Sequence, residues 1–92
     1  MQHVHGVLVR ASGSGQETVL GPVSGRFIRI DRGATPRLWC LVLAEPVPLP
    51  VGPDDALRLG ETTFRILATR YDAAGRLTEL TVTATASHPA PS

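Results

Sequence analysis

The side chains best suited to chemistry are few in this sequence, and the histidines illustrate the point. His3 and His5 alternate near the N-terminus, so both would lie on one face of an extended strand. Two imidazoles on one face are a possible pair of metal ligands, and His88 could add a third only if the termini meet. We interpret all three as ordinary terminal histidines, so the sequence predicts no metal site.

The single cysteine and the acidic residues do not form a catalytic pattern. Cys40 lies in the apolar run Leu38–Leu43, so we expect a buried, unreactive thiol. Asp54–Asp55 could bind a cation, but acids beside turns more often cap backbone groups in water. Ser12 and Ser14 lie among glycines without a nucleophile-elbow motif, and no glycine-rich loop precedes a helix. We predict no catalytic residue, no cofactor and no enzyme activity.

Nucleic-acid binding would require exposed aromatic side chains beside basic ones on one sheet face. The best fragment of that pattern is Phe27 between Arg26 and Arg29. The net charge of +1 provides no strong field toward nucleic acid or an anionic membrane. No apolar run approaches the roughly 18 residues of a membrane-spanning helix. We predict no membrane partner and keep nucleic-acid binding as an alternative.

The composition predicts one small folded domain with a surface suited to contacts. The chain has 92 residues, of which 42% are hydrophobic and 18% are charged. The charged share is below the roughly 25% that is usual for globular domains, and a surface poor in charge is easier to dehydrate. We predict a single domain over residues 1–86 and a loose tail over residues 87–92.

Short apolar runs separated by turn residues predict that the chain forms β-strands. The side chains considered above would lie on these strands or in the turns between them. Leu38–Leu43 is continuously apolar, so we expect it to be the central and most buried strand. Ile28 and Ile30 would share one face of their strand, with Phe27 and Arg29 on the other. In the first half of the chain, the strands are predicted over Gly6–Ala11, Glu17–Gly21 (ended by Gly21-Pro22), Gly25–Asp31 and Leu38–Leu43, with a turn at Arg32–Pro36.

The segment Glu45–Pro53 carries proline at alternate positions. Proline removes backbone donors, so the segment cannot be an inner strand and should stay extended. Two readings remain open. The segment is a stiff connector packed on the domain, which we favour, or an arm that docks on a neighbouring molecule.

The second half of the chain predicts a β-hairpin. Asp72–Gly75 is the loop, with Gly75 in the left-handed region. Leu77 breaks the alternation of the return strand, which indicates a bulge near Thr78. Phe64, Ile66 and Ala68 are predicted to share one face of the first strand. The return strand is predicted to turn Leu80, Val82 and Ala84 inward. The whole pattern predicts an all-β fold, a small antiparallel barrel or sandwich with a C-terminal hairpin.

The stretch from Val51 to Val82 contains PDDALRLGETTFRI and then YDAAGRLTELTV. A turn, a short strand, a glycine, an aromatic strand and a Leu-rich hairpin follow in that order. This order resembles the small β-barrel head–tail connector proteins of tailed bacteriophages, which are also called head closure, stopper or head–tail joining proteins.

The resemblance implies a non-enzymatic structural protein of the virion, assembled in the host cytoplasm. Copies would form a ring between the portal or adaptor and the tail, and DNA would be present only as the content of the channel. A capsid decoration (cement) protein that binds the major capsid protein, a small tail component and a non-viral β-barrel binding module remain alternatives.

We expect the contacts with partners to lie in three segments that the composition predicts to be exposed. They are Ser12, Gly13, Ser14, Gly15 and Gln16 in one loop, Arg32, Gly33, Ala34, Thr35, Pro36 and Arg37 in a second, and Pro46, Pro48, Leu49 and Pro50 in the proline-rich segment.

Overall fold

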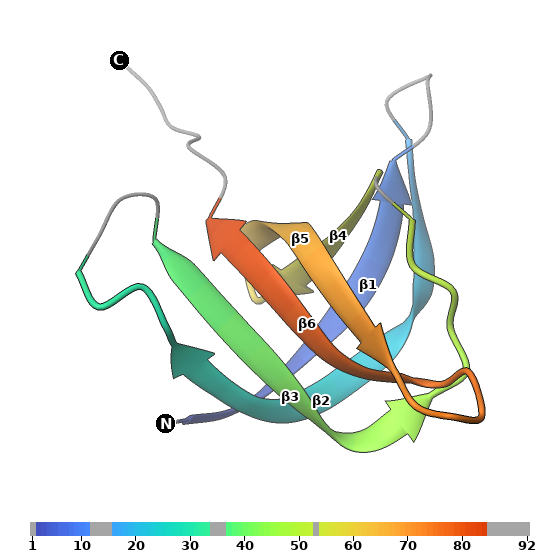
Figure 1. Cartoon of the computed structure of the whole chain (residues 1–92). Helices are drawn as coiled ribbons and strands as arrows, with labels where there is room; N and C mark the ends of the chain where they lie inside the picture. The colour runs from blue at the N-terminus through green and yellow to red at the C-terminus, as the bar shows by residue number, and fades with distance from the viewer. Residues whose placement is uncertain (1, 12–15, 34–36, 53, 85–92) are drawn as a thin grey trace.

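The protein is an antiparallel β-barrel (Figure 1). A computed structural model describes residues 2–11, 16–33, 37–52 and 54–84. These residues form six strands, which are β1 (Gln2–Ala11), β2 (Glu17–Arg29), β3 (Leu38–Val47), β4 (Asp55–Leu59), β5 (Thr62–Tyr71) and β6 (Leu77–Ala84). The strands close in the order β1-β2-β3-β6-β5-β4, and β4 pairs with β1. The predicted all-β fold is confirmed, as a barrel. No helix that could span a membrane is found among the described residues.

Aliphatic side chains from all six strands fill the barrel. Closure of so few strands leaves an interior just large enough for side chains, and it pairs the strand edges that would otherwise be open. Leu8, Leu41, Leu57, Leu77, Leu80 and Val82 are fully buried, and Val23, Leu43, Phe64 and Ile66 complete the core.

Three one-residue β-bulges, together with an irregular register in β3 between Val42 and Val47, allow the strands to bend around this core. Each inserts one extra residue, at Leu20 in β2, Leu67 in β5 and Thr78 in β6. The bulge at Thr78 is confirmed, and it is why Leu77 and Leu80 can both point inward.

One side chain does not lie on the face predicted for it. The bulge at Leu67 turns Ala68 to the outside, opposite Thr81, so it does not share a face with Ile66. Ala84 keeps the inner face predicted for it, opposite Phe64, but it is exposed because it is the last residue of β6.

Strand β2 is longer than the sequence predicted, because it continues through Gly21-Pro22. A strand tolerates proline where no neighbour requires its N–H group. At Pro22, strand β2 pairs with β1 alone, since the pairing with β3 covers only Gly25–Arg29. The expected break between two short strands was therefore wrong.

Strand β3 is not the most buried strand, contrary to expectation, because only its inner face is buried. Leu41 and Leu43 point into the core, but Cys40 and Val42 lie half-buried on the outer face. The apolar run alternates in and out of the barrel like the other strands. The strand also continues through Pro46 to Val47, where it pairs with β6 alone.

The proline-rich segment after β3 is a connector packed on the barrel, as favoured from the sequence. Leu49 and Val51 pack against the core, and a Leu49 methyl group lies 2.9 Å from the position of a Cβ built on Gly21. The Val51 backbone N–H donates to the Tyr71 hydroxyl at 3.0 Å. The connector thereby links β2 to β5 at the barrel end where β3 and β5 finish, which we call the connector end.

A cluster of three aromatic rings lies at the opposite end, where β2 finishes and β3 and β5 begin. Phe27 and Trp39 stack with ring centroids 5.8 Å apart, and Phe64 meets both edge-on at 5.3 Å. We call this the aromatic end. The rings pack against the aliphatic core at this end, and offset or edge-on contacts are the favoured geometries for such rings.

The first prediction concerns Gly25, where β2 and β3 approach most closely. A Cβ atom on this residue would overlap the Val42 carbonyl oxygen and lie 2.8 Å from the Leu43 Cα atom. These are backbone atoms of a paired strand and cannot move aside. We expect Gly25→Ala to lower the free energy of unfolding by about 3 kcal/mol in urea titration.

Gly60→Ala is the matched control. Gly60 has a positive φ of 61°, but nothing lies within 4 Å of its Cβ position. This variant should lose only about 1 kcal/mol, the cost of left-handed backbone. Equal losses in the two variants would contradict the close approach at Gly25.

Candidate functional site

Asp55, which the sequence placed in a turn, is a structural ion-pair partner. Arg10 Nε and Nη2 donate to its two carboxylate oxygens at 2.8 and 3.0 Å, and Gly52 N–H donates at 2.7 Å. The side chain is buried, and the hydrogen bond from Arg10 lowers its pKa. Because it is buried and accepts three hydrogen bonds, Asp55 is neither a solvated turn residue nor an obvious cation ligand. The pair joins β1 to β4 at the point of barrel closure.

Asp31 fixes the loop between β2 and β3 in the same way. Arg29 Nε donates to both carboxylate oxygens at 3.0 and 2.9 Å, and the backbone N–H groups of Gly33 and Leu38 donate at 2.6 and 2.9 Å. The hydrogen bond from Arg29 is the main cause that lowers the pKa of Asp31 to about 2. Arg32, the residue after Asp31, has a positive φ of 54°. The Asp31 carboxylate therefore stabilises this turn, which does not depend on a glycine alone.

Asp72 organises the hairpin loop. Its carboxylate accepts the backbone N–H groups of Ala74 and Arg76, both at 2.9 Å, and the bond from Arg76 is the main cause that lowers its pKa. Gly75 has a φ of 80°, which confirms the left-handed position predicted for it. These three aspartates stabilise loops, so their role in the fold does not depend on any reaction.

The second prediction concerns stability in acid. A carboxyl group whose pKa is lower in the folded state stabilises the fold above its unfolded pKa, near 4, and loses that contribution as the pH falls toward the folded value. For Asp31 the loss should occur between about pH 4 and the folded pKa of about 2. Asp31→Asn should lower the melting temperature at pH 7 and flatten the fall of melting temperature below pH 4.

Glu61→Gln provides the control for this measurement. It removes an exposed carboxylate that has no ion pair with any described residue. The acid-dependent loss should keep its wild-type size in this variant. An Asp31→Asn protein with the full wild-type pH dependence would contradict the assigned role of Asp31.

Cys40 is only half-buried, not fully buried as expected. It lies on the outer face of β3, opposite Thr81 of β6. Burial raises its pKa to about 11, and the Glu79 carboxylate contributes through charge and a hydrogen bond. A thiol in this environment lacks the electropositive surroundings that activate a nucleophile.

The third prediction follows from Glu79. At pH 8, Cys40 should react with iodoacetamide far more slowly than a free thiol, because its thiolate is scarce. Glu79→Gln removes the neighbouring negative charge, so it should lower the thiol pKa and speed the reaction severalfold. The rate is measured against pH, with Glu61→Gln as the matched control. A wild-type rate that levels off below pH 9 would contradict this assignment.

The other residues that the sequence offered for chemistry do not form a nucleic-acid platform or a metal site among the described residues. Phe27 belongs to the ring cluster at the aromatic end, so it cannot form a stacking platform beside Arg26 and Arg29. The rings of His3 and His5 lie 5.1 Å apart. Within the described residues, no group of three His, Cys, Asp or Glu side chains is placed to hold a metal ion. His88 lies outside those residues.

The outer face of β2, β3, β6 and β5 carries an uncharged row. Ile28, Cys40, Thr81 and Ala68 are directly opposite one another from strand to strand. The next row toward the connector end contains Arg26, Val42, Glu79 and Arg70 in the same order. An uncharged row beside arginines is the composition that protein interfaces favour.

Charge is distributed unevenly along the barrel axis, a property that the sequence reading missed because it requires the topology. Counted by the strand half or loop that carries each residue, six arginines and two acids lie toward the aromatic end, which gives a formal charge of +4; they are Arg26, Arg29, Arg32, Arg37, Arg58, Arg65, Asp31 and Glu61. Three arginines and six acids lie toward the connector end, which gives −3; they are Arg10, Arg70, Arg76, Glu17, Glu45, Asp54, Asp55, Asp72 and Glu79.

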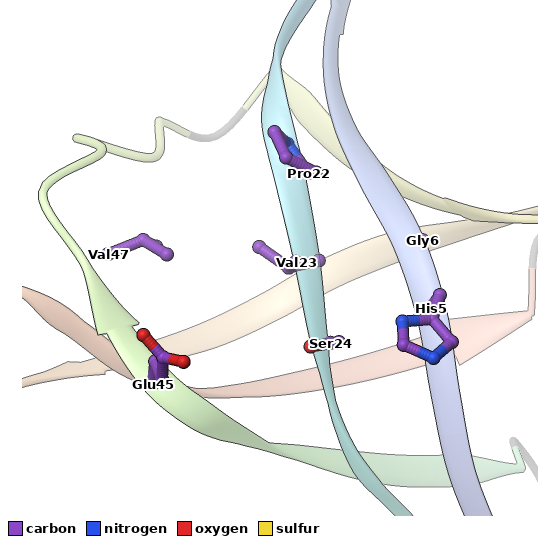
Figure 2. A pocket seen from close by; sticks show the side chains of 7 residues that line it. All are labelled: His5, Gly6, Pro22, Val23, Ser24, Glu45 and Val47. Carbon is purple, nitrogen blue, oxygen red and sulfur yellow. The ribbon is translucent and has the colours of Figure 1, made fainter.

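A groove opens where β2 and β3 separate beyond their paired residues (Figure 2). Its volume is about 250 Å³, and it is lined by His5, Gly6, Pro22, Val23, Ser24, Glu45 and Val47. In Figure 2, Val23 and Val47 point toward each other from the two strands, and the Glu45 carboxylate lies on the β3 side. Small-molecule sites usually occupy roughly 300–1,000 Å³, so this groove suits a single side chain better.

The predicted contact segments are placed as follows. Gln16, Arg32, Gly33, Arg37, Pro46, Pro48 and Pro50 are exposed, whereas Leu49 is half-buried against the core. Ser12–Gly15 and Ala34–Pro36 lie outside the described residues, as do residues 85–92, which include the predicted tail. A role for any of these residues in contacts stays a prediction.

The geometry defines a closed six-stranded antiparallel barrel whose distinctive features are surfaces. Comparisons with protein-family models, with curated proteins and with solved structures found no match to this chain.

Proposed function

We propose that this protein is a non-enzymatic structural component of a tailed-bacteriophage virion. In this proposal it is a head–tail connector of the stopper or head closure type, and copies form a ring between the portal or adaptor and the tail. The support is the resemblance over Val51–Val82 and the all-β barrel, together with the surfaces described above.

The charge polarity of the barrel is the observation that carries the proposal furthest. A ring requires a heterologous interface, in which one surface of a subunit binds a different surface of the next. A basic aromatic end and an acidic connector end favour that arrangement and disfavour contact between like ends. In a two-fold symmetric pair, the same polarity would require an antiparallel arrangement, with the basic end of each copy against the acidic end of the other.

A capsid decoration protein is the second candidate. The uncharged row from Ile28 to Ala68 favours it, because such a face could lie on a capsid lattice without any ring. A small tail component and a non-viral binding module rest on the same surface and remain alternatives.

The fourth prediction tests the virion assignment. The purified protein is mixed with portal, capsid and tail fractions of a candidate phage, and the mass and copy number of each complex are measured. A connector should join the portal-containing complex at a ring-like copy number. A variant that lacks residues 12–16 should bind less, because one predicted contact loop is removed.

Other outcomes reassign the protein. Binding at many copies to the capsid lattice would indicate a decoration protein, and binding to the tail fraction alone would indicate a tail component. A protein that joins none of these fractions would contradict the virion assignment. Full binding by the variant without residues 12–16 would remove that loop from the interface.

A further inference from the structure

Glu45 is the charged group of the groove between β2 and β3, and it has no ion-pair partner among the described residues. The alternation of β3 turns its side chain toward the seam, as it does those of Leu43 and Val47. The seam is open there because β2 and β3 pair only as far as Gly25 and Leu43. The carboxylate is therefore exposed beside the apolar surfaces of Val23 and Val47.

This combination of groups fits an arginine side chain. The methylene stem of arginine packs on apolar surface while its planar guanidinium binds a carboxylate through two hydrogen bonds. Val23 and Val47 provide the apolar walls, and Glu45 provides the carboxylate at the rim. Pro22 and Pro46 border the same seam without backbone donors, which makes the addition of a whole strand there less favourable.

Arg37 is the arginine of this chain that is best placed to enter such a groove. It is exposed, and no ion pair with a described residue engages it. Its carbonyl oxygen accepts a hydrogen bond of 2.7 Å from the Thr83 hydroxyl, so its backbone is fixed to β6 where β3 begins. A side chain that projects from a fixed strand end loses less entropy on binding than one on a loop tip.

Arg37 cannot reach Glu45 of its own chain. The two residues are eight positions apart along β3, and at 3.3 Å per residue this separation is about 26 Å. Only the Arg37 of another copy can occupy the groove.

We infer that Arg37 of one copy binds in the β2–β3 groove of the next, with its guanidinium on Glu45. The contact joins the basic aromatic end of one barrel to the acidic half of another. Repeated in one direction from copy to copy, the contact is heterologous and generates a ring or, if the rotation does not close, a filament. The inference rests on the self-association in the proposed function, but not on the virion assignment.

The test uses full-length protein, with mass measured by light scattering and sedimentation over a concentration series. The wild type should self-associate, and 1 M salt should weaken the association by screening charge. Arg37→Glu and Glu45→Arg should each weaken it roughly ten- to a hundredfold, which is the range for hydrogen bonds to charged groups. Both side chains are exposed, so thermal unfolding should show that both variants fold.

Two further measurements make the test specific: one on a mixture of the two single variants, and one on a double variant that carries both changes. Arg37→Glu keeps the groove and Glu45→Arg keeps the donor, so the two variants together should pair through one wild-type contact. Growth beyond two subunits would have to use the weaker contact with reversed charges. The double variant Arg37→Glu/Glu45→Arg should regain part of the lost association, because the reversed charges can pair. Arg32→Glu and Glu61→Arg make the same charge changes elsewhere and should retain association close to that of the wild type.

Several results would overturn the inference. These are a wild type that stays monomeric at the highest concentration, a Glu45→Arg variant that associates normally, and mixed variants that do not combine. An Arg32→Glu variant as impaired as Arg37→Glu would also overturn it, because general charge would then explain the association. A protein that self-associates through Glu45 but joins no virion fraction would retain this inference and lose the virion assignment.

Discussion

Closing six short strands around a narrow interior requires each strand to bend, and β2 is the strand on which this closure depends. It pairs with β1 from Glu17 to Phe27 but with β3 only from Gly25 onward, where the two backbones come too close for a side chain. The groove exists because the strands separate beyond that point. Stability and the proposed contact site therefore originate in the same local geometry.

The small size of the barrel also determines which structural roles its charged side chains have. A barrel of this size has few residues to spare for its loops, so aspartates hold them through backbone N–H groups and neighbouring arginines. Asp31 holds the β2–β3 loop, Asp72 the hairpin and Asp55 the contact of β1 with β4. The remaining charged side chains lie on the outer surface. Their uneven distribution makes one end of the barrel basic and the other end acidic.

The sequence predicted the features that short-range patterns control. The hairpin loop, Gly75 and the bulge at Thr78 follow from residues within a few positions of one another. The bulge at Leu67 could not be predicted, because Leu67 and Ala68 are both apolar and either could face inward. The ion pair of Asp55 joins residues 45 positions apart, and the groove depends on how two strands diverge. Neither leaves a local signal, so most of the candidate site required the structure.

The position of β6 between β3 and β5 has a consequence for synthesis on the ribosome. Until β6 emerges, β3 and β5 have no strand between them, and the inward faces of both are open to solvent. The hairpin at Asp72–Gly75 is short, so β6 is delivered beside β5 as soon as it leaves the exit tunnel. A tight turn at this place shortens the time during which the nascent chain exposes surfaces that could aggregate.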